Sequence, residues 1–174
     1  MKTLFFILTL LTCLQASAEI RVAFIEMTDT RGRRVELEPG GRFAHVAVST
    51  ETGWLHAYPP GAVRIANEGE LKAMGKITII TLDRPALTLR ESHKFIGKAY
   101  DNTYSWSDDK IYSSELVGKL LNIEPLAMDF SGDYWRGRRP APEQEKGLSP
   151  DDIYRSLSRQ PSALPKPKRA GTPK

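Results

Sequence analysis

The chain has 174 residues, which is long enough for one domain with a substantial hydrophobic core but not obviously for two. Its formal net charge is only +4, and much of the basic excess lies near the C-terminus. No basic motif is interleaved with aromatic residues, so nucleic-acid binding is not expected. The only cysteine is Cys13, so the chain cannot form an internal disulfide.

Residues 1–18, MKTLFFILTLLTCLQASA, have the pattern of a cleavable secretory signal peptide. A lysine at position 2 precedes an apolar run, and Ala16-Ser17-Ala18 forms an Ala-x-Ala cleavage site. We therefore expect a mature chain that begins at Glu19, carries no thiol, and is periplasmic or secreted. A lipid anchor on Cys13 is the lesser alternative, because it would cut the apolar run short. No segment is long enough to span a bilayer, so no transmembrane segment is predicted.

Residues 20–66 predict an antiparallel meander of short strands. The runs IRVAFIEM, RVELE, FAHVAVST, WLHAY and AVRIA are apolar or alternating, and turn residues such as TDTRG, PGG, ETG and PPG separate them. Residues 68–75 predict a short helix, and KITIITL (76–82) predicts a further strand.

The second half of the chain predicts helices joined by irregular segments. Helices are expected at 89–98, at 109–121, where Glu115 and Lys119 form an i,i+4 pair, and after Ser149, which would cap a helix with Pro150 in its first turn. Residues 160–174 are basic and proline-rich and predict a disordered tail. The predicted organisation is a signal peptide (1–18), one domain (19–159) and this tail.

Two histidines and a pair of serines are the candidates for chemistry. His45 and His56 lie on consecutive predicted strands, and a short turn near Glu51 would make them diagonal neighbours on one face, roughly 7–8 Å apart at their backbones. Ser113 and Ser114 open the predicted helix 109–121. A nucleophile at a helix N-terminus gains from the helix dipole, and an oriented histidine can remove its proton.

Each of these residues also has a structural interpretation. Serine is common in the first turn of a helix, where its hydroxyl satisfies free backbone N–H groups. A histidine on an amphipathic strand is often a hydrogen-bonded core residue, and His93 lies on a polar helix face where solvation is expected. Residue spacing alone favours these structural roles over a His–His–Ser site.

The segment GKAYDNTYSWSDDKIYSSELV resembles a hallmark of the YiiX/YaeF-like permuted papain-fold proteins, which are relatives of NlpC-type cell-wall peptidases. The family pattern is Gly-Lys-x-Tyr-Asp, an aromatic and acidic loop, and then Tyr-Cys-Ser-Glu-Leu at a helix start. The matching residues are Gly97, Lys98, Tyr100, Asp101, Tyr112, Ser114, Glu115 and Leu116. His45 in HVAV matches the family histidine, His56 stands at the place of its polar third member, and SPDDIYRSL is similar to its Ser-Pro-Asp ending.

The resemblance implies an α+β fold, in which a small, curved antiparallel sheet packs with helices in a circularly permuted papain-like (NlpC-type) arrangement. It implies a cleft between the helix and the sheet, with Ser113 where the family has its nucleophilic cysteine, His45 as base and His56 as the orienting residue. Tyr100, Asp101 and Tyr112 are the expected substrate-binding residues. No metal or other cofactor is expected.

Three functions follow from these observations. The first is an exported hydrolase of amide or acyl bonds whose partner is a peptide, peptidoglycan or acyl substrate. The second is an inactive pseudoenzyme that binds a peptide or lipid in the same cleft, because serine is a much weaker acid than cysteine. The third is a scaffold whose Lys166, Lys168, Arg169 and Lys174 contact anionic envelope polymers, against the simpler interpretation of a solvated terminus. Substrate and oligomeric state stay open.

Overall fold

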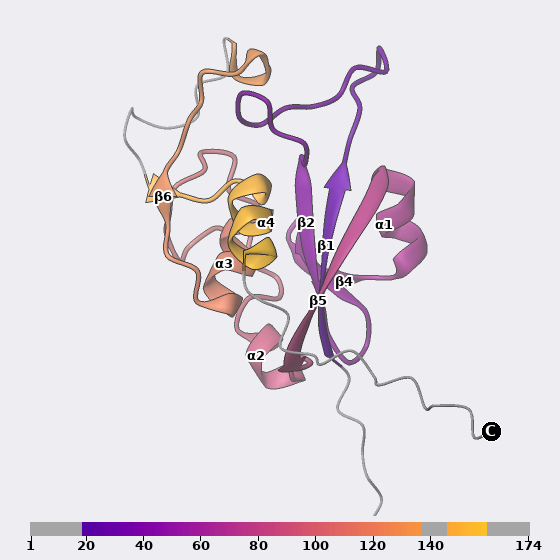
Figure 1. Cartoon of the computed structure of the whole chain (residues 1–174). Helices are drawn as coiled ribbons and strands as arrows, with labels where there is room; N and C mark the ends of the chain where they lie inside the picture. Colours follow the sequence, from indigo (N-terminus) through magenta and orange to yellow (C-terminus); the bar gives the residue numbers. More distant parts are fainter. Residues whose placement is uncertain (1–18, 137–145, 160–174) are drawn as a thin grey trace, which may run out of the picture.

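A computed structural model describes residues 19–136 and 146–159 (Figure 1). A five-stranded antiparallel sheet has the order β4-β3-β2-β1-β5. Helices α3 and α4 lie on one side of this sheet and α1 on the other, as Figure 1 shows. The architecture is therefore α+β, as expected from the sequence. The predicted signal peptide and the predicted tail lie outside the described residues.

The first four strands form the predicted meander. They are β1 (Glu19–Glu26), β2 (His45–Ser49), β3 (Trp54–Ala57) and β4 (Val63–Ala66). Each pairs antiparallel with the next along the chain. All residues of β2 and β3 are buried, because these strands lie in the interior of the sheet and are covered on both faces.

Strand β5 (Lys76–Pro85) completes the sheet by pairing with β1 rather than with β4. Helix α1 (Glu68–Met74) connects β4 to β5 from one edge of the sheet to the other. The side chain of Asn67 caps α1 by accepting a hydrogen bond from the N–H of Glu70. The Glu70 carboxylate in turn accepts from the N–H of Asn67. Strand β1 is therefore an interior strand, paired with β2 on one side and with β5 on the other, and β2 lies at the centre of the sheet.

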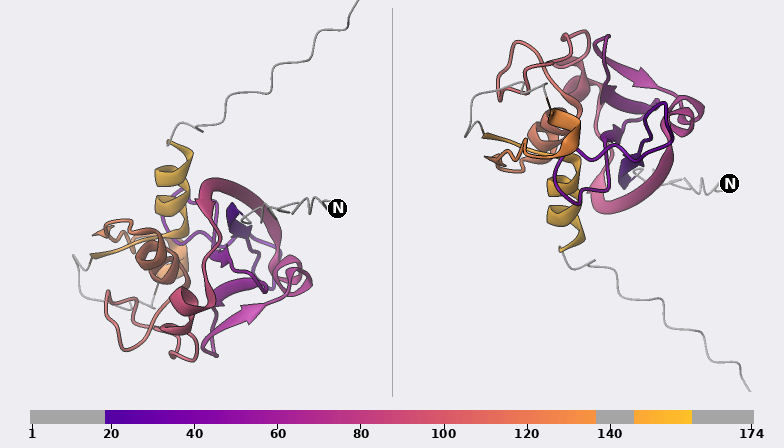
Figure 2. Two further views of the ribbon diagram at one scale, coloured as in Figure 1. Left: turned by 90° about the horizontal axis from the view of Figure 1, so that it is seen from below. Right: turned by 90° about the horizontal axis from the view of Figure 1, so that it is seen from above.

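Two apolar clusters hold the layers together. The larger contains Val46, Val48 and Leu55 from the sheet together with residues of α3 (Ser113–Leu121) and α4 (Pro150–Ser158). The smaller joins Ala47 and Trp54 to residues such as Leu71 of α1. The two views along the sheet in Figure 2 show the same separation of helices. Residues that alternate along β2 and β3 thus pack against different layers.

Several predicted elements differ from the structure. The segment RVELE is not a strand; apart from one bridge between Thr28 and Arg34 it forms an irregular loop, in which the indole N–H of Trp135 bonds to the Leu37 carbonyl. Helix α2 (Leu89–His93) is shorter than predicted and is followed by turns to Gly97, which has a φ of 86°. Helix α3 begins at Ser113 rather than near 109, and the N–H groups of Ser107 and Tyr112 before it bond to the Glu115 carboxylate in its first turn.

Three short elements were not predicted. Strands β6 (Leu126–Ala127) and β7 (Lys146–Gly147) form a separate two-stranded ribbon, and η1 (Asp133–Trp135) is a single 3₁₀ turn. The predicted cap of α4 is confirmed: the Ser149 hydroxyl accepts from the N–H of Asp152, with Pro150 in the first turn. Among residues 19–136 and 146–159, no helix is long and apolar enough to cross a membrane.

Candidate functional site

His45 and His56 meet as the predicted hairpin register requires. The pairs Val48↔Leu55 and Ser49↔Trp54 set this register, which makes the two histidines diagonal neighbours. Nε2 of His45 lies 3.0 Å from Nδ1 of His56, and one of the two nitrogens carries the shared proton. The structure therefore brings this predicted pair into direct contact.

Burial controls the charge of both imidazoles. His45 is 3% exposed and His56 is fully buried. Desolvation, with repulsion from His56, lowers the pKa of His45 to about 3, and desolvation, with repulsion from Arg64, lowers the pKa of His56 to about 4. Tyr58 covers both rings, stacking on His56 and meeting His45 edge-on. At neutral pH the pair is uncharged.

The shared proton can be arranged in two ways, with different chemical consequences. When it is on Nε2 of His45, Nδ1 of His45 has a free lone pair and His56 carries its own proton on Nε2. When it is on Nδ1 of His56, His45 is protonated at Nδ1 and cannot act there as a base. Among the described residues, Nε2 of His56 is buried without a hydrogen-bond partner, which costs about 1–3 kcal/mol.

Ser113 is the first residue of α3, which packs against β2 and β3. It is 5% exposed, and its backbone N–H is among those that a helix leaves without an internal partner. The body of α3 belongs to the cluster that contains Val46 and Val48, which alternate with His45 on β2. By this alternation His45 points toward the other face of the sheet, where Ala47 and Trp54 pack with Leu71 of α1. Within the described part of the chain, the Ser113 hydroxyl makes no hydrogen bond with either histidine.

The three predicted substrate-binding residues shape the segment before α3. The Asp101 carboxylate accepts four bonds, from the N–H and hydroxyl groups of Thr103 and Ser105. Burial acts to raise the pKa of Asp101, but these bonds outweigh it and hold the pKa below its usual value. The Tyr100 and Tyr104 hydroxyls lie 3.2 Å apart, and the Tyr112 hydroxyl accepts from the N–H of Leu148. Their role in substrate binding stays a prediction.

Two further carboxylates hold the site in place. Glu115 forms the predicted pair with Lys119, at 2.9 Å. Asp151, at the start of α4, accepts from the backbone N–H groups of Arg42 and Phe43, just before His45. Asp151 was not among the predicted site residues, although the Ser-Pro-Asp ending of the family pattern includes it.

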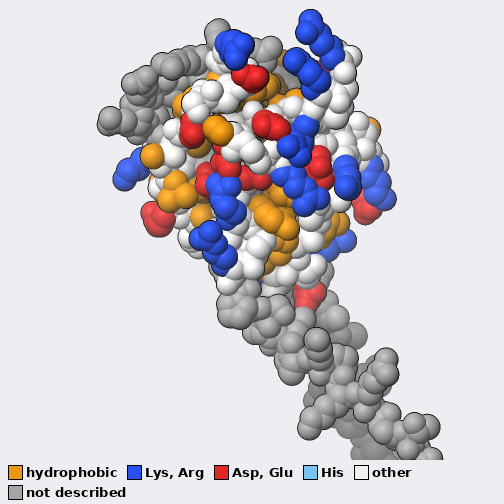
Figure 3. All heavy atoms as spheres, turned by 45° about the horizontal axis from the view of Figure 1, so that its top comes forward, with side chains coloured by type: hydrophobic (Ala, Val, Ile, Leu, Met, Phe, Trp, Pro, Cys, Tyr) orange, Lys and Arg blue, Asp and Glu red, His pale blue; other side chains and the backbone are white. Residues whose placement is uncertain are grey.

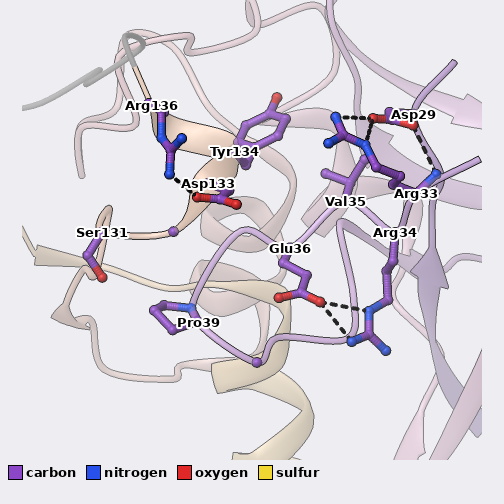
Figure 4. A pocket seen from close by; sticks show the side chains of 12 residues that line it. Asp29, Arg33, Arg34, Val35, Glu36, Pro39, Ser131, Asp133, Tyr134 and Arg136 are labelled. Atoms are coloured by element: carbon purple, nitrogen blue, oxygen red, sulfur yellow. Dashed lines mark hydrogen bonds and ion pairs between the residues drawn. The ribbon is translucent and has the colours of Figure 1, made fainter. Parts of the chain in front are cut away.

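A pocket of about 650 Å³ lies away from these residues, between the β1–β2 loop and the segment around η1. None of the predicted site residues lines it. Its charged side chains are paired: Arg33 with Asp29, Arg34 with Glu36, and Arg136 with Asp133 (Figure 4). Figure 3 shows basic and acidic side chains intermingled on the neighbouring face. The cleft expected between α3 and the sheet stays a prediction.

Comparison with known proteins rests on the fold. No family model and no curated protein sequence matches the chain. The crystal structure of metalloprotein YiiX from Escherichia coli O157:H7 matches with a TM-score of 0.59 and 20% sequence identity, over 78% of this chain and 91% of that one. The chain has the YiiX fold. The resemblance to YiiX-like proteins that the sequence motifs suggested is thereby confirmed at the level of the fold.

The E. coli YiiX protein is called a metalloprotein. In residues 19–136 and 146–159, no three His, Cys, Asp or Glu side chains lie close enough together to hold a metal ion. His45 and His56 also each use one ring nitrogen on the other. These residues do not fit a metal site.

Proposed function

We propose that this chain is an exported hydrolase of amide or acyl bonds that uses Ser113 as nucleophile, His45 as base and His56 as the orienting residue. The observation that carries the proposal is the buried 3.0 Å contact between His45 and His56, on the two strands that contact α3. Such a pair can fix one imidazole in the tautomer that accepts a proton. Export follows from the signal peptide expected before Glu19.

The proposed reaction has two steps. The Ser113 oxygen attacks the acyl carbon while His45 takes the hydroxyl proton at Nδ1, and that proton passes to the departing amine or alcohol. Water then attacks the acyl-serine, again losing a proton to His45, and releases the acid. The free N–H groups at the start of α3 would stabilise the oxyanion. Since Ser113 is not hydrogen bonded to His45 in the free protein, its side chain has to turn toward the imidazole when substrate binds.

A second function is favoured by one specific observation. Burial lowers the pKa of His45 to about 3, so this imidazole holds a proton weakly and is a poor base near neutral pH. The same fold would then act as a pseudoenzyme that binds a peptide or lipid without cleaving it. The cell-wall peptides expected from the family resemblance are one class of ligand for either function.

A fluorophosphonate probe separates the two functions. For the hydrolase, the probe is expected to label the mature chain, and Ser113→Ala should abolish labelling. His45→Ala should slow labelling by at least about a hundredfold, the usual contribution of a general base, while Ser114→Ala, the matched control beside the nucleophile, should label normally. Absence of labelling, together with catalysis gained by Ser113→Cys, would support the pseudoenzyme and exclude the serine hydrolase.

A further inference from the structure

A buried ion pair lies within the first two turns of α3, directly behind Ser113. The Glu115 side chain is fully buried and that of Lys119 is 17% exposed, with 2.9 Å between the carboxylate and the ammonium. Burying a charge without a partner is strongly unfavourable. The two residues therefore depend on each other for their charged states.

The pair also holds the segment that leads into α3. Glu115 accepts hydrogen bonds from the backbone N–H groups of Ser107 (3.0 Å) and Tyr112 (3.4 Å). Lys119 bonds to the Ser107 carbonyl and to the Asp108 carboxylate at 2.7 Å, and its ammonium lies 5.3 Å from the centre of the Trp106 ring. Residues 106–112 are thus fixed on the helix whose first residue is Ser113.

The charge of Glu115 works against a second negative charge at the same helix end. The N-terminus of a helix favours an anion through its dipole and its free N–H groups. A carboxylate two residues after Ser113 reduces that advantage unless a cation neutralises it. Burial already raises the pKa of Glu115 to about 7, against the opposing effects of Lys119 and the Tyr112 N–H. Asp101 raises the pKa of Glu115 further, and Lys119 is the cation that bonds to the Glu115 carboxylate and lowers it.

We propose that Lys119 is a positioning residue that neutralises Glu115 and so keeps the first turn of α3 able to stabilise negative charge at position 113. Its part in a reaction rests on the proposed function, whereas its electrostatic effect at that position does not. The role of Glu115 in this scheme is to anchor residues 107–112, and Lys119 offsets the electrostatic cost of that anchor.

The test places a thiol at the nucleophile position as a reporter of local potential. Ser113→Cys is introduced together with Cys13→Ser, so that the chain has a single cysteine, and the thiol pKa is measured from thiolate absorbance and from the pH dependence of iodoacetamide alkylation. Adding Lys119→Met is expected to raise this pKa by about one pH unit, and adding Glu115→Gln to lower it. The combination of both should return it close to the parent value, and Lys119→Arg should leave it unchanged.

The matched control is Lys72→Met, which breaks an exposed i,i+4 pair with Glu68 on α1 and should not move the thiol pKa. If Lys119→Met and Glu115→Gln shift the pKa in the same direction, or not at all, the pair is only structural and the proposal is overturned. Fluorophosphonate labelling of the unmodified Ser113 is measured separately. If the probe does not label Ser113 but the thiol pKa shifts as expected, the hydrolase is rejected and the electrostatic role of Lys119 is supported.

Discussion

Acidification from about pH 7 to about pH 4 is expected to destabilise the folded chain by roughly 3 kcal/mol for each of His45 and His56. Burial lowers the folded-state pKa of these residues to about 3 and about 4, from an ordinary value of 6.5. Below pH 6.5 the two histidines are therefore protonated in the unfolded chain but still neutral in the folded chain. The stabilisation is fully present above that value and is lost as the pH falls toward the folded pKa values.

Chemical denaturation across this pH range measures the effect. The double variant His45→Gln/His56→Gln has neither titrating imidazole, so its stability should not show this loss on acidification. The difference in free energy of unfolding between it and the native sequence should therefore shrink as the pH falls. His93→Gln, at an exposed histidine, is the matched control and should leave the pH dependence intact. A stability difference for the double variant that is equal at both ends of the range would contradict the neutral buried pair.

Replacing Asp151 by alanine is expected to destabilise the fold by roughly 2–4 kcal/mol. The Asp151 carboxylate is 7% exposed and lies 3.0 Å from the backbone N–H groups of both Arg42 and Phe43. Alanine leaves these donors without an acceptor in a buried setting. Because Phe43 is two residues before His45, the loss should also loosen the start of β2.

Asp152→Ala is the matched control for Asp151→Ala, since it removes a neighbouring carboxylate from the same helix. Asp152 bonds to the N–H of Ser149 and pairs with Arg155, so its loss should cost about 1 kcal/mol, as for other helix caps. Asp151→Asn keeps one acceptor oxygen and should fall between the two in urea denaturation. Equal stabilities for Asp151→Ala and Asp152→Ala would show that Asp151 does not hold β2.

Local rules were sufficient to predict the parts of the site that depend on short sequence distances. Alternation along two strands joined by a tight turn placed His45 beside His56, and helical spacing placed Glu115 beside Lys119. The cap of α4 was likewise readable from Ser149 and Pro150. In each case only one or a few backbone geometries can satisfy the pattern.

Contacts between distant segments could not be predicted in this way. Asp151 bonds to backbone groups 108 and 109 residues away, and no sequence pattern specifies which N–H groups a carboxylate will find. The segment RVELE alternates like a strand, but alternation does not supply a neighbouring strand to pair with. The relation of Ser113 to His45 depends on side-chain orientation at a helix end, which residue spacing does not determine.

The pairing of β1 with both β2 and β5 has a consequence for the order in which the fold assembles. The β2–β3 hairpin closes over a short turn, so the contact between His45 and His56 requires only local chain closure, which is fast. The pairing of β1 with β5 joins Glu19 to Pro85 and has to close a far longer loop. The imidazole pair can therefore form while the sheet is still incomplete.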